Sequence, residues 1–349
     1  MTNEQSREIT RRKQNWIDLY DGKRHAVPFL YYNGIRPRPF PRPDNIDERV
    51  QWAIDNYELQ LTQMDCIHTD NVPFLQPFTG TELFAAAFGA QVHYPDDNMP
   101  FALPMVHCVD ECTRIPDVGL DAKPLADVFG IADRLKQAHP DALLALPDIQ
   151  SPLDIAALLW GKEDFFPSLL AEPEAVLSLV DKTEALLIAF LDEWFARYGT
   201  ETIAHFPDYY FPRGVTLSED EVGSISPALF ETFSLPSLTA LSNRYGGIGM
   251  HCCAHSTHQW TNFKKIPNLK LLNLSPHTGT PAEAFTFFDG HSAQMHGTMQ
   301  VTGTSGAYVK HFIPCMGQIV VQAEAGTKEE AIAKSILLQE LVDEYEKAK

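Results

Sequence analysis

Short apolar segments rich in strand-forming residues alternate with longer helical patterns along the chain, and this alternation restricts the possible folds most strongly. It is typical of a parallel sheet whose faces are covered by helices. Eight segments are predicted to be strands: Val27–Tyr32, Cys66–Asp70, Ala142–Pro147, Glu201–Phe206, Gly247–Cys252, Leu269–Leu274, Ala293–His296 and Ile319–Gln322. Eight such strands predict an α/β fold of the TIM (β/α)8 barrel type, as a single domain over residues 1–349.

The segments between these strands carry helical periodicity and helix start signals. Helices are predicted at Ile46–Thr62, Leu125–Gln137, Glu174–Arg197, Pro227–Tyr245, Pro281–Phe288 and Lys328–Glu346. Ser226-Pro227 and Thr280-Pro281 each place a capping hydroxyl before Pro at the first helical position. An N-terminal extension precedes the first strand, and a hairpin is predicted to be inserted near Pro104–Arg114. An open doubly wound sheet is the alternative, but no glycine-rich phosphate-binding motif follows a predicted strand.

Charge and cysteine content exclude several classes of partner and compartment. The chain has 27 basic and 46 acidic side chains, a formal net charge of -19, which argues against nucleic acid and anionic membrane surfaces. The N-terminus lacks the apolar core of a secretory signal, and there is no apolar run of about 18 residues. Six cysteines in 349 residues do not form a disulfide framework. A cytoplasmic protein with reduced thiols is therefore expected.

In a TIM barrel the chemistry takes place at the carboxyl ends of the strands. The polar residues at or just beyond the predicted strand ends are Asn33, Arg36, His68, Asp70, Asp148, His205, Asp208, His251, Cys253, Asn273, His277, His296 and, before the last strand, Cys315. Catalytic roles are predicted for Asp220, His205 and Asp70, and substrate contacts for Asn33, Arg36, Glu219, Tyr210 and His277. The alternative for Asp220, Glu219, His205 and Asp70 is a hydrogen-bonded or solvated loop residue, and for Tyr210 a place in the barrel rim.

The segment Met250–His258 carries the strongest local signal for a metal site. His251 and Cys253 are two residues apart on a predicted strand, so both side chains lie on one face, whereas Cys252 faces the other way. Imidazole and thiolate are ligands that zinc prefers. Cys315, in a Pro/Gly-framed loop before the last strand, is the natural third ligand, and three ligands leave one position open, as in catalytic zinc sites.

Two alternatives to this ligand set remain open at the level of the sequence. His251 and the two cysteines can instead be packed core residues. His251 and His255 are four residues apart, and a helix beginning early would give another ligand set, with His258 nearby. Asn273 or His277 can supply the hydrogen bond that a metal-bound imidazole usually makes.

Several short motifs are spread over most of the chain: Gly80-Thr81, Ala86–Ala90, Asp148–Asp154, Leu159–Gly161, Ser218–Asp220, Ser226–Glu231, Phe233–Pro236 and Gly246-Gly247. Together these motifs resemble the uroporphyrinogen decarboxylase superfamily. The resemblance implies a TIM barrel with its active-site cleft at the carboxyl ends of the strands.

Two branches of this superfamily differ in their site residues. The decarboxylases carry an arginine-rich motif after the first strand, whereas this chain has Tyr31–Arg38, in which only Arg36 and Arg38 are available to bind carboxylates. The methylcobamide:coenzyme M methyltransferases carry His-x-Cys and a later Cys as zinc ligands. His251, Cys253 and Cys315 occur here in that order, although Ala254 stands where that branch usually has Gly.

The second branch therefore implies a zinc-dependent methyltransferase. Its reaction moves a methyl group between a corrinoid (cobamide) on a partner protein and a small thiol or folate acceptor. The alternatives are a metal-free decarboxylase or lyase that uses Arg36, Asp70 or Asp220, and a non-catalytic member that binds a small molecule. A homodimer is a further possibility, because the decarboxylases dimerise across the cleft.

Overall fold

A computed structural model describes residues 1–32, 39–42, 44–96, 98–275, 281–297 and 317–349. Its largest sheet contains six parallel strands in the order β1-β12-β11-β10-β9-β8. These strands are β1 (Ala26–Tyr32), β8 (Val215–Ser218), β9 (Ile248–Cys252), β10 (Leu269–Leu274), β11 (Ala293–His296) and β12 (Ile319–Ala325). Their residues are almost all buried on both faces, as expected for parallel strands under a helical layer.

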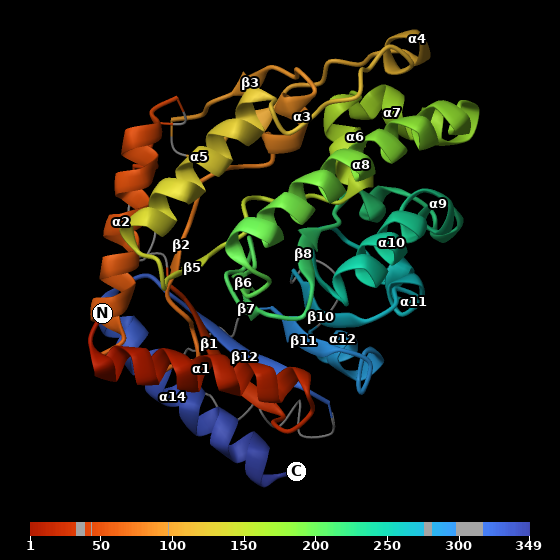
Figure 1. The fold of residues 1–349 in the computed structure, drawn as a ribbon. Coiled ribbons are helices and arrows are strands. Elements are labelled where there is room, and N and C mark those ends of the chain that lie inside the picture. The colour runs from red at the N-terminus through yellow and green to blue at the C-terminus, as the bar shows by residue number, and fades with distance from the viewer. Residues whose placement is uncertain (33–38, 43, 97, 276–280, 298–316) are drawn as a thin grey trace.

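Shorter strands continue the wall from β8 back to β1. β2 (Phe74–Leu75) pairs in parallel with β5 (Leu143–Leu144), and Ala145 just beyond β5 bridges to β6 (Thr202–Ile203). Gln150 then bridges to the end of β8, while the Asn71 side chain bonds both the N–H and the C=O of Leu30 in β1 at 2.9 Å. The parallel strands and the helices that cover them agree with the α/β TIM-barrel class that the sequence predicted (Figure 1).

Helices cover the outer face of this wall (Figure 1). The longer ones are α2 (Ile46–Gln63), α5 (Lys123–Ala138), α6 (Pro152–Leu159), α7 (Lys162–Ala171), α8 (Pro173–Tyr198), α9 (Pro227–Phe233), α10 (Leu235–Tyr245), α12 (Pro281–Phe287) and α14 (Lys328–Lys347). The predicted start of α9 is confirmed, because Ser226 accepts from the Leu229 N–H at 3.3 Å. Thr280, the other predicted cap, lies outside the described residues. None of the described helices combines the length and apolarity needed to span a membrane.

The helix α1 (Asn3–Tyr20) lies across the amino-terminal ends of the strands. Its Trp16 is fully buried between Phe29 of β1 and Tyr209, with ring centroids 6.2 and 6.0 Å away. Tyr209 in turn fills the barrel beneath Gly249 of β9, where an added Cβ would lie 2.3 Å from the Tyr209 hydroxyl. This end of the barrel is therefore closed by side chains, and the chemistry is confined to the opposite end.

Three local predictions were wrong, and one strand was not predicted. Residues Cys66–Asp70 form no strand, because the second wall strand is β2 at Phe74–Leu75. The inserted hairpin comprises β3 (Val92–His93) and β4 (Phe101–Ala102), whereas Pro104–Arg114 contains the short helix α4 (Val109–Cys112). The predicted helix Pro227–Tyr245 is broken into α9 and α10 at Ser234, next to Pro236 in the first turn of α10. The strand β8 was not predicted, since it is four residues long and lacks flanking periodicity.

Candidate metal centre

Two cavities open at the carboxyl ends of the strands and meet at His251. The larger has a volume of about 800 Å³ and the smaller about 280 Å³. Tyr31, Phe206 and His251 line both cavities, while Cys253 and Asn273 line only the smaller one. The larger volume matches the size of cavities that hold cofactors and drug-sized ligands. His251 therefore stands between two parts of one cleft.

Three side chains with metal-ligand chemistry converge at this point. Ligand atoms of Asp220, His251 and Cys253 all lie within 4.8 Å of one another. Strands β8 and β9 are neighbours with Ser218 opposite His251, so Asp220 just after β8 lies beside Cys253 just after β9. The Cys253 N–H donates to Asp220 Oδ1 at 2.6 Å, and Cys252 is fully buried.

The tautomer of His251 follows from its hydrogen bonds. Asn273 of β10 donates its Nδ2 hydrogen to the Met295 carbonyl at 2.5 Å, so its Oδ1 must be the atom that faces His251. That oxygen lies 2.5 Å from His251 Nδ1 and can only accept. Nδ1 therefore carries the proton, and Nε2 keeps its lone pair for a metal. Burial lowers the pKa of His251, which keeps the imidazole neutral even though Asp220 and Asn273 act in the opposite direction.

The buried carboxylate of Asp154 holds the backbone at Asp220. Asp154 of α6 accepts the N–H of Asp220 at 2.7 Å and that of Glu221 at 3.0 Å. Burial, and then the charges of Glu219, Asp220 and Glu221, raise the pKa of Asp154. Burial and the charge of Asp220, with which it also forms a hydrogen bond, raise the pKa of the Cys253 thiol to about 12. An incoming cation offsets this concentration of negative charge.

The donor set fits zinc. Imidazole nitrogen, thiolate sulfur and carboxylate oxygen are all zinc ligands, and three of them leave a fourth tetrahedral position for substrate. His255 and His258 are exposed and do not belong to the cluster found within the described part of the chain. Cys315, the predicted third ligand, lies outside the described residues, as do Asn33, Arg36 and His277. Asp220, predicted as a catalytic group, is instead placed among the candidate ligands.

The family follows from comparison with known proteins. The family model for uroporphyrinogen decarboxylase (URO-D) matches residues 56–304, which is most of the chain. The chain belongs to the uroporphyrinogen decarboxylase family. Among solved structures, a methyltransferase from Methanosarcina mazei is similar in fold, with a TM-score of 0.66 and 11% sequence identity. The similarity covers 96% of this chain and 98% of that one. A comparison with curated protein sequences gave no match.

His205 and Glu219 occupy different positions relative to the cleft of this URO-D family member. His205 lines the large cavity with its Nε2 2.9 Å from Ser218 Oγ, so it is placed to contact a ligand. Glu219 is fully buried behind the wall and accepts from Ser234 Oγ at 2.9 Å. Burial raises the pKa of Glu219 to about 8, although the Ser234 and Ser151 hydroxyls lower it. Glu219 lines neither cavity, and its N–H donates to the His251 carbonyl at 2.9 Å.

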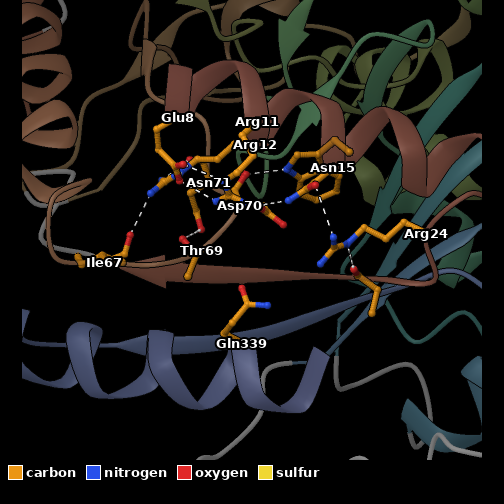
Figure 2. Close-up of polar contacts among 12 residues, drawn as sticks. Glu8, Arg11, Arg12, Asn15, Arg24, Ile67, Thr69, Asp70, Asn71 and Gln339 are labelled. Carbon is orange, nitrogen blue, oxygen red and sulfur yellow. Dashed lines mark hydrogen bonds and ion pairs between the residues drawn. The ribbon is translucent and has the colours of Figure 1, made fainter. Parts of the chain in front are cut away.

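The structure separates Asp70 and Tyr210 from the cleft. Asp70 is buried beneath α1, where Asn15 donates to its carboxylate at 2.9 Å and Arg11 at 3.3 Å (Figure 2). The Trp16 indole also donates to the Asp70 carbonyl at 2.7 Å. Tyr210 lies at the same end, with the Lys13 ammonium 5.4 Å from its ring centroid. Both side chains hold α1 in place, which corrects the expectation of catalytic and substrate contacts.

Two residues that shape the site carry no local sequence signal of a role. Asp154 stands out in the sequence only as part of a family motif, and Gln76 belongs to no motif. Ser151-Pro152 signals the start of α6 and places Asp154 in its first turn, but nothing local indicates that its carboxylate reaches the loop after β8. Gln76 follows β2 and lines the large cavity. Because the second strand was predicted at Cys66–Asp70, Gln76 was not expected at the carboxyl end of a strand.

Proposed function

We propose that this protein is a zinc-dependent methyltransferase that moves a methyl group between a corrinoid protein and a thiol or folate acceptor. The convergence of Asp220, His251 and Cys253 at the meeting point of the two cavities carries this proposal. It is supported by the Asn273 contact, which leaves His251 Nε2 available as a ligand.

The charges of the three side chains suit a divalent cation. A neutral imidazole, a carboxylate and a thiolate together carry two negative charges, which balance the two positive charges of Zn²⁺. When bound, zinc favours the thiolate form of a thiol acceptor at neutral pH, where a free thiol with a pKa near 8.5 is mostly protonated. Asp154 keeps Asp220 in position through the backbone N–H groups of Asp220 and Glu221. The volume of the large cavity, about 800 Å³, suits a small acceptor.

In the transfer to a thiol, a bond forms between sulfur and the methyl carbon while the cobalt–carbon bond breaks. The electron pair of that bond remains on cobalt, and the thiol proton passes to solvent or a nearby base. His205, whose Nε2 lies 2.9 Å from Ser218 Oγ on the cavity wall, is the described lining imidazole besides His251 that can orient an acceptor.

A metal-free decarboxylase or lyase is the second candidate, and the family match favours it. Decarboxylation of a polyanionic porphyrinogen requires cationic groups in the cleft. The described residues that line the large cavity include Asp148 and Asp220 but neither lysine nor arginine. This surface disfavours a ligand with many carboxylates.

Metal content separates the two functions. We expect about one zinc per chain by inductively coupled plasma mass spectrometry in the wild type, with loss in Cys253→Ala and His251→Ala. Cys108→Ala is the matched control, because Cys108 is an exposed thiol at the start of α4. Comparing Asp220→Asn with Cys315→Ala shows which residue provides the third ligand. A wild type without zinc, or stoichiometric zinc retained in Cys253→Ala and Cys315→Ala, contradicts the proposal.

Activity provides the second measurement. Zinc-loaded protein is incubated with methylcobalamin and small thiols, and the loss of the methylcobalamin absorbance is followed. We expect turnover that is lost with Cys253→Ala and retained with Cys108→Ala.

A further inference from the structure

The large cavity extends beyond the candidate metal centre to a second group of polar residues. Gln76 and Asp148 line it together with Asp220 and His251, so the two groups share one continuous space. Gln76 is only 9% exposed, and its Oε1 has no hydrogen-bond partner among the described residues. A buried acceptor without a partner is costly, and a ligand that donates a hydrogen bond removes this cost.

Asp148 lines the same cavity as this orphan acceptor and is held there by two hydrogen bonds. Its N–H donates to Thr79 Oγ1 at 2.8 Å, and Gln150 Nε2 donates to its Oδ1. Both contacts come from residues that also line the cavity. The Thr79 contact fixes the backbone of Asp148 and the Gln150 contact restrains its carboxylate before any ligand arrives, so binding orders few side chains.

The charges that line the cavity determine whether it favours a cationic or an anionic ligand. Its described walls contain two carboxylates, Asp148 and Asp220, and no lysine or arginine. Aromatic rings of Tyr31, Phe40 and Phe206 add faces on which a cation is stabilised. An anionic group placed here meets repulsion, whereas an ammonium group finds acceptors for its N–H donors.

We propose that the methyl acceptor is a thiol that carries an ammonium group. Its sulfur lies at the Asp220–His251–Cys253 centre, and its ammonium group binds Asp148 and Gln76. The inference rests on the proposed methyltransferase function for the role of the sulfur. The recognition of the ammonium group rests on the cavity alone.

The test compares three thiols that differ in charge: 2-aminoethanethiol, 2-mercaptoethanol and 2-mercaptoethanesulfonate. Dissociation constants are measured by ligand-observed NMR titration with the zinc-loaded full chain. We expect the cationic thiol to bind tightest and the anionic thiol weakest. Asp148→Asn should weaken binding of the cationic thiol by about tenfold or more while changing that of the neutral thiol little. Gln76→Leu should also weaken binding of the cationic thiol more than binding of the neutral thiol.

Asp343→Asn is the matched control, because Asp343 is an exposed carboxylate on α14 that accepts only a surface hydrogen bond from Gln339 in the described structure. It should leave all three affinities unchanged. Circular dichroism melting of each variant shows that the fold is retained. Equal or tighter binding of 2-mercaptoethanesulfonate by the wild type, or unchanged affinities in Asp148→Asn, would overturn the inference.

A fourth ligand, ethylamine, separates this inference from the proposed function. It lacks sulfur, so its binding reports the ammonium site without the metal. If ethylamine binding depends on Asp148 but 2-aminoethanethiol binds no tighter than ethylamine, the cationic site stands and the metal-centred function fails. If thiols bind through zinc but without any preference for positive charge, the function stands and the inference fails.

Discussion

At the scale of single residues, His251 depends on Asn273 for its suitability as a ligand. The amide fixes which ring nitrogen carries the proton, and it is itself fixed by the Met295 carbonyl. His251 alone is a buried imidazole on a strand, a residue that in most proteins is simply packed. The hydrogen bond from its Nδ1 turns the lone pair of Nε2 toward the cleft, where Asp220 and Cys253 meet it.

We therefore predict that Asn273→Leu lowers zinc affinity by about 10–100-fold, because outer partners of metal-bound histidines contribute that much. Competition with a chromogenic chelator measures the change. Asn262→Leu is the control, since Asn262 is a buried asparagine that bonds the Pro227 carbonyl outside the cleft. Equal zinc affinity in Asn273→Leu and the wild type would show that Asn273 does not orient His251.

Glu82 gives a pH-dependent prediction at the same scale. Burial, with a smaller contribution from the charge of Asp148, raises its pKa from 4.5 to about 7, although backbone N–H groups and Arg49 lower it. Between pH 4.5 and 7 the folded protein keeps a proton that the unfolded chain loses, so this residue makes stability fall as pH rises through that window. Above pH 7 its contribution is constant.

Glu82→Gln removes this loss and preserves an acceptor for the Gly80 N–H. We expect the variant to gain up to roughly 3 kcal/mol over the wild type at pH 8, and little at pH 4.5. Thermal melting at both pH values measures the difference. A gain of the same size at both values would contradict the titration of Glu82.

At the scale of elements, the contacts of α1 show that Asp70 has a structural role. The helix lies over the amino-terminal strand ends and binds Asp70 through Arg11 and Asn15 (Figure 2). The same helix buries Arg12, which donates to the carbonyls of Ile67 and Asn71. The segment after α2 is thereby used to anchor α1, which explains why Cys66–Asp70 is a loop despite its strand-forming composition.

We predict that Asp70→Ala lowers the free energy of unfolding by about 1–3 kcal/mol, because it removes the buried acceptor that ties Asn15 and Arg11 of α1 to the barrel. Its zinc content and cleft affinities should match those of the wild type. Asp55→Ala, an exposed carboxylate on α2, should change neither quantity. Chemical denaturation and metal analysis test both statements, and loss of zinc in a folded Asp70→Ala would contradict the structural role.

At the scale of the whole molecule, a bound metal joins neighbouring strands of the barrel. Asp220 follows β8 and Cys253 follows β9, so a zinc ion that binds both stabilises the folded chain but not the unfolded one. Ligand at one hundred times its dissociation constant adds about 2.7 kcal/mol to the free energy of unfolding. We predict that chelation lowers the Tm of the wild type by several degrees and leaves that of His251→Ala unchanged. An equal Tm with and without chelator in the wild type would exclude a metal centre.

Much of the architecture was determined by the sequence, because its signals are local. Alternation of strand and helix periodicity predicted the barrel, and two-residue spacing predicted that His251 of β9 and Cys253 just after it lie together, apart from the buried Cys252. Ser226 marked the start of a helix through a contact three residues away. Such features need only the geometry of the strand or helix that contains them.

Tertiary structure decided which carboxylates take part in the site. Asp70, Asp148, Asp154, Glu219 and Asp220 have the same chemistry in the sequence, and only strand order, burial and the position of α1 distinguish them. The pairing of β8 with β9 brings Asp220 next to Cys253, and Asp70 lies at the closed end of the barrel, where it binds α1. These contacts join residues far apart in the chain. Their formation depends on which strands pair and which surfaces are buried, and local sequence patterns do not predict either.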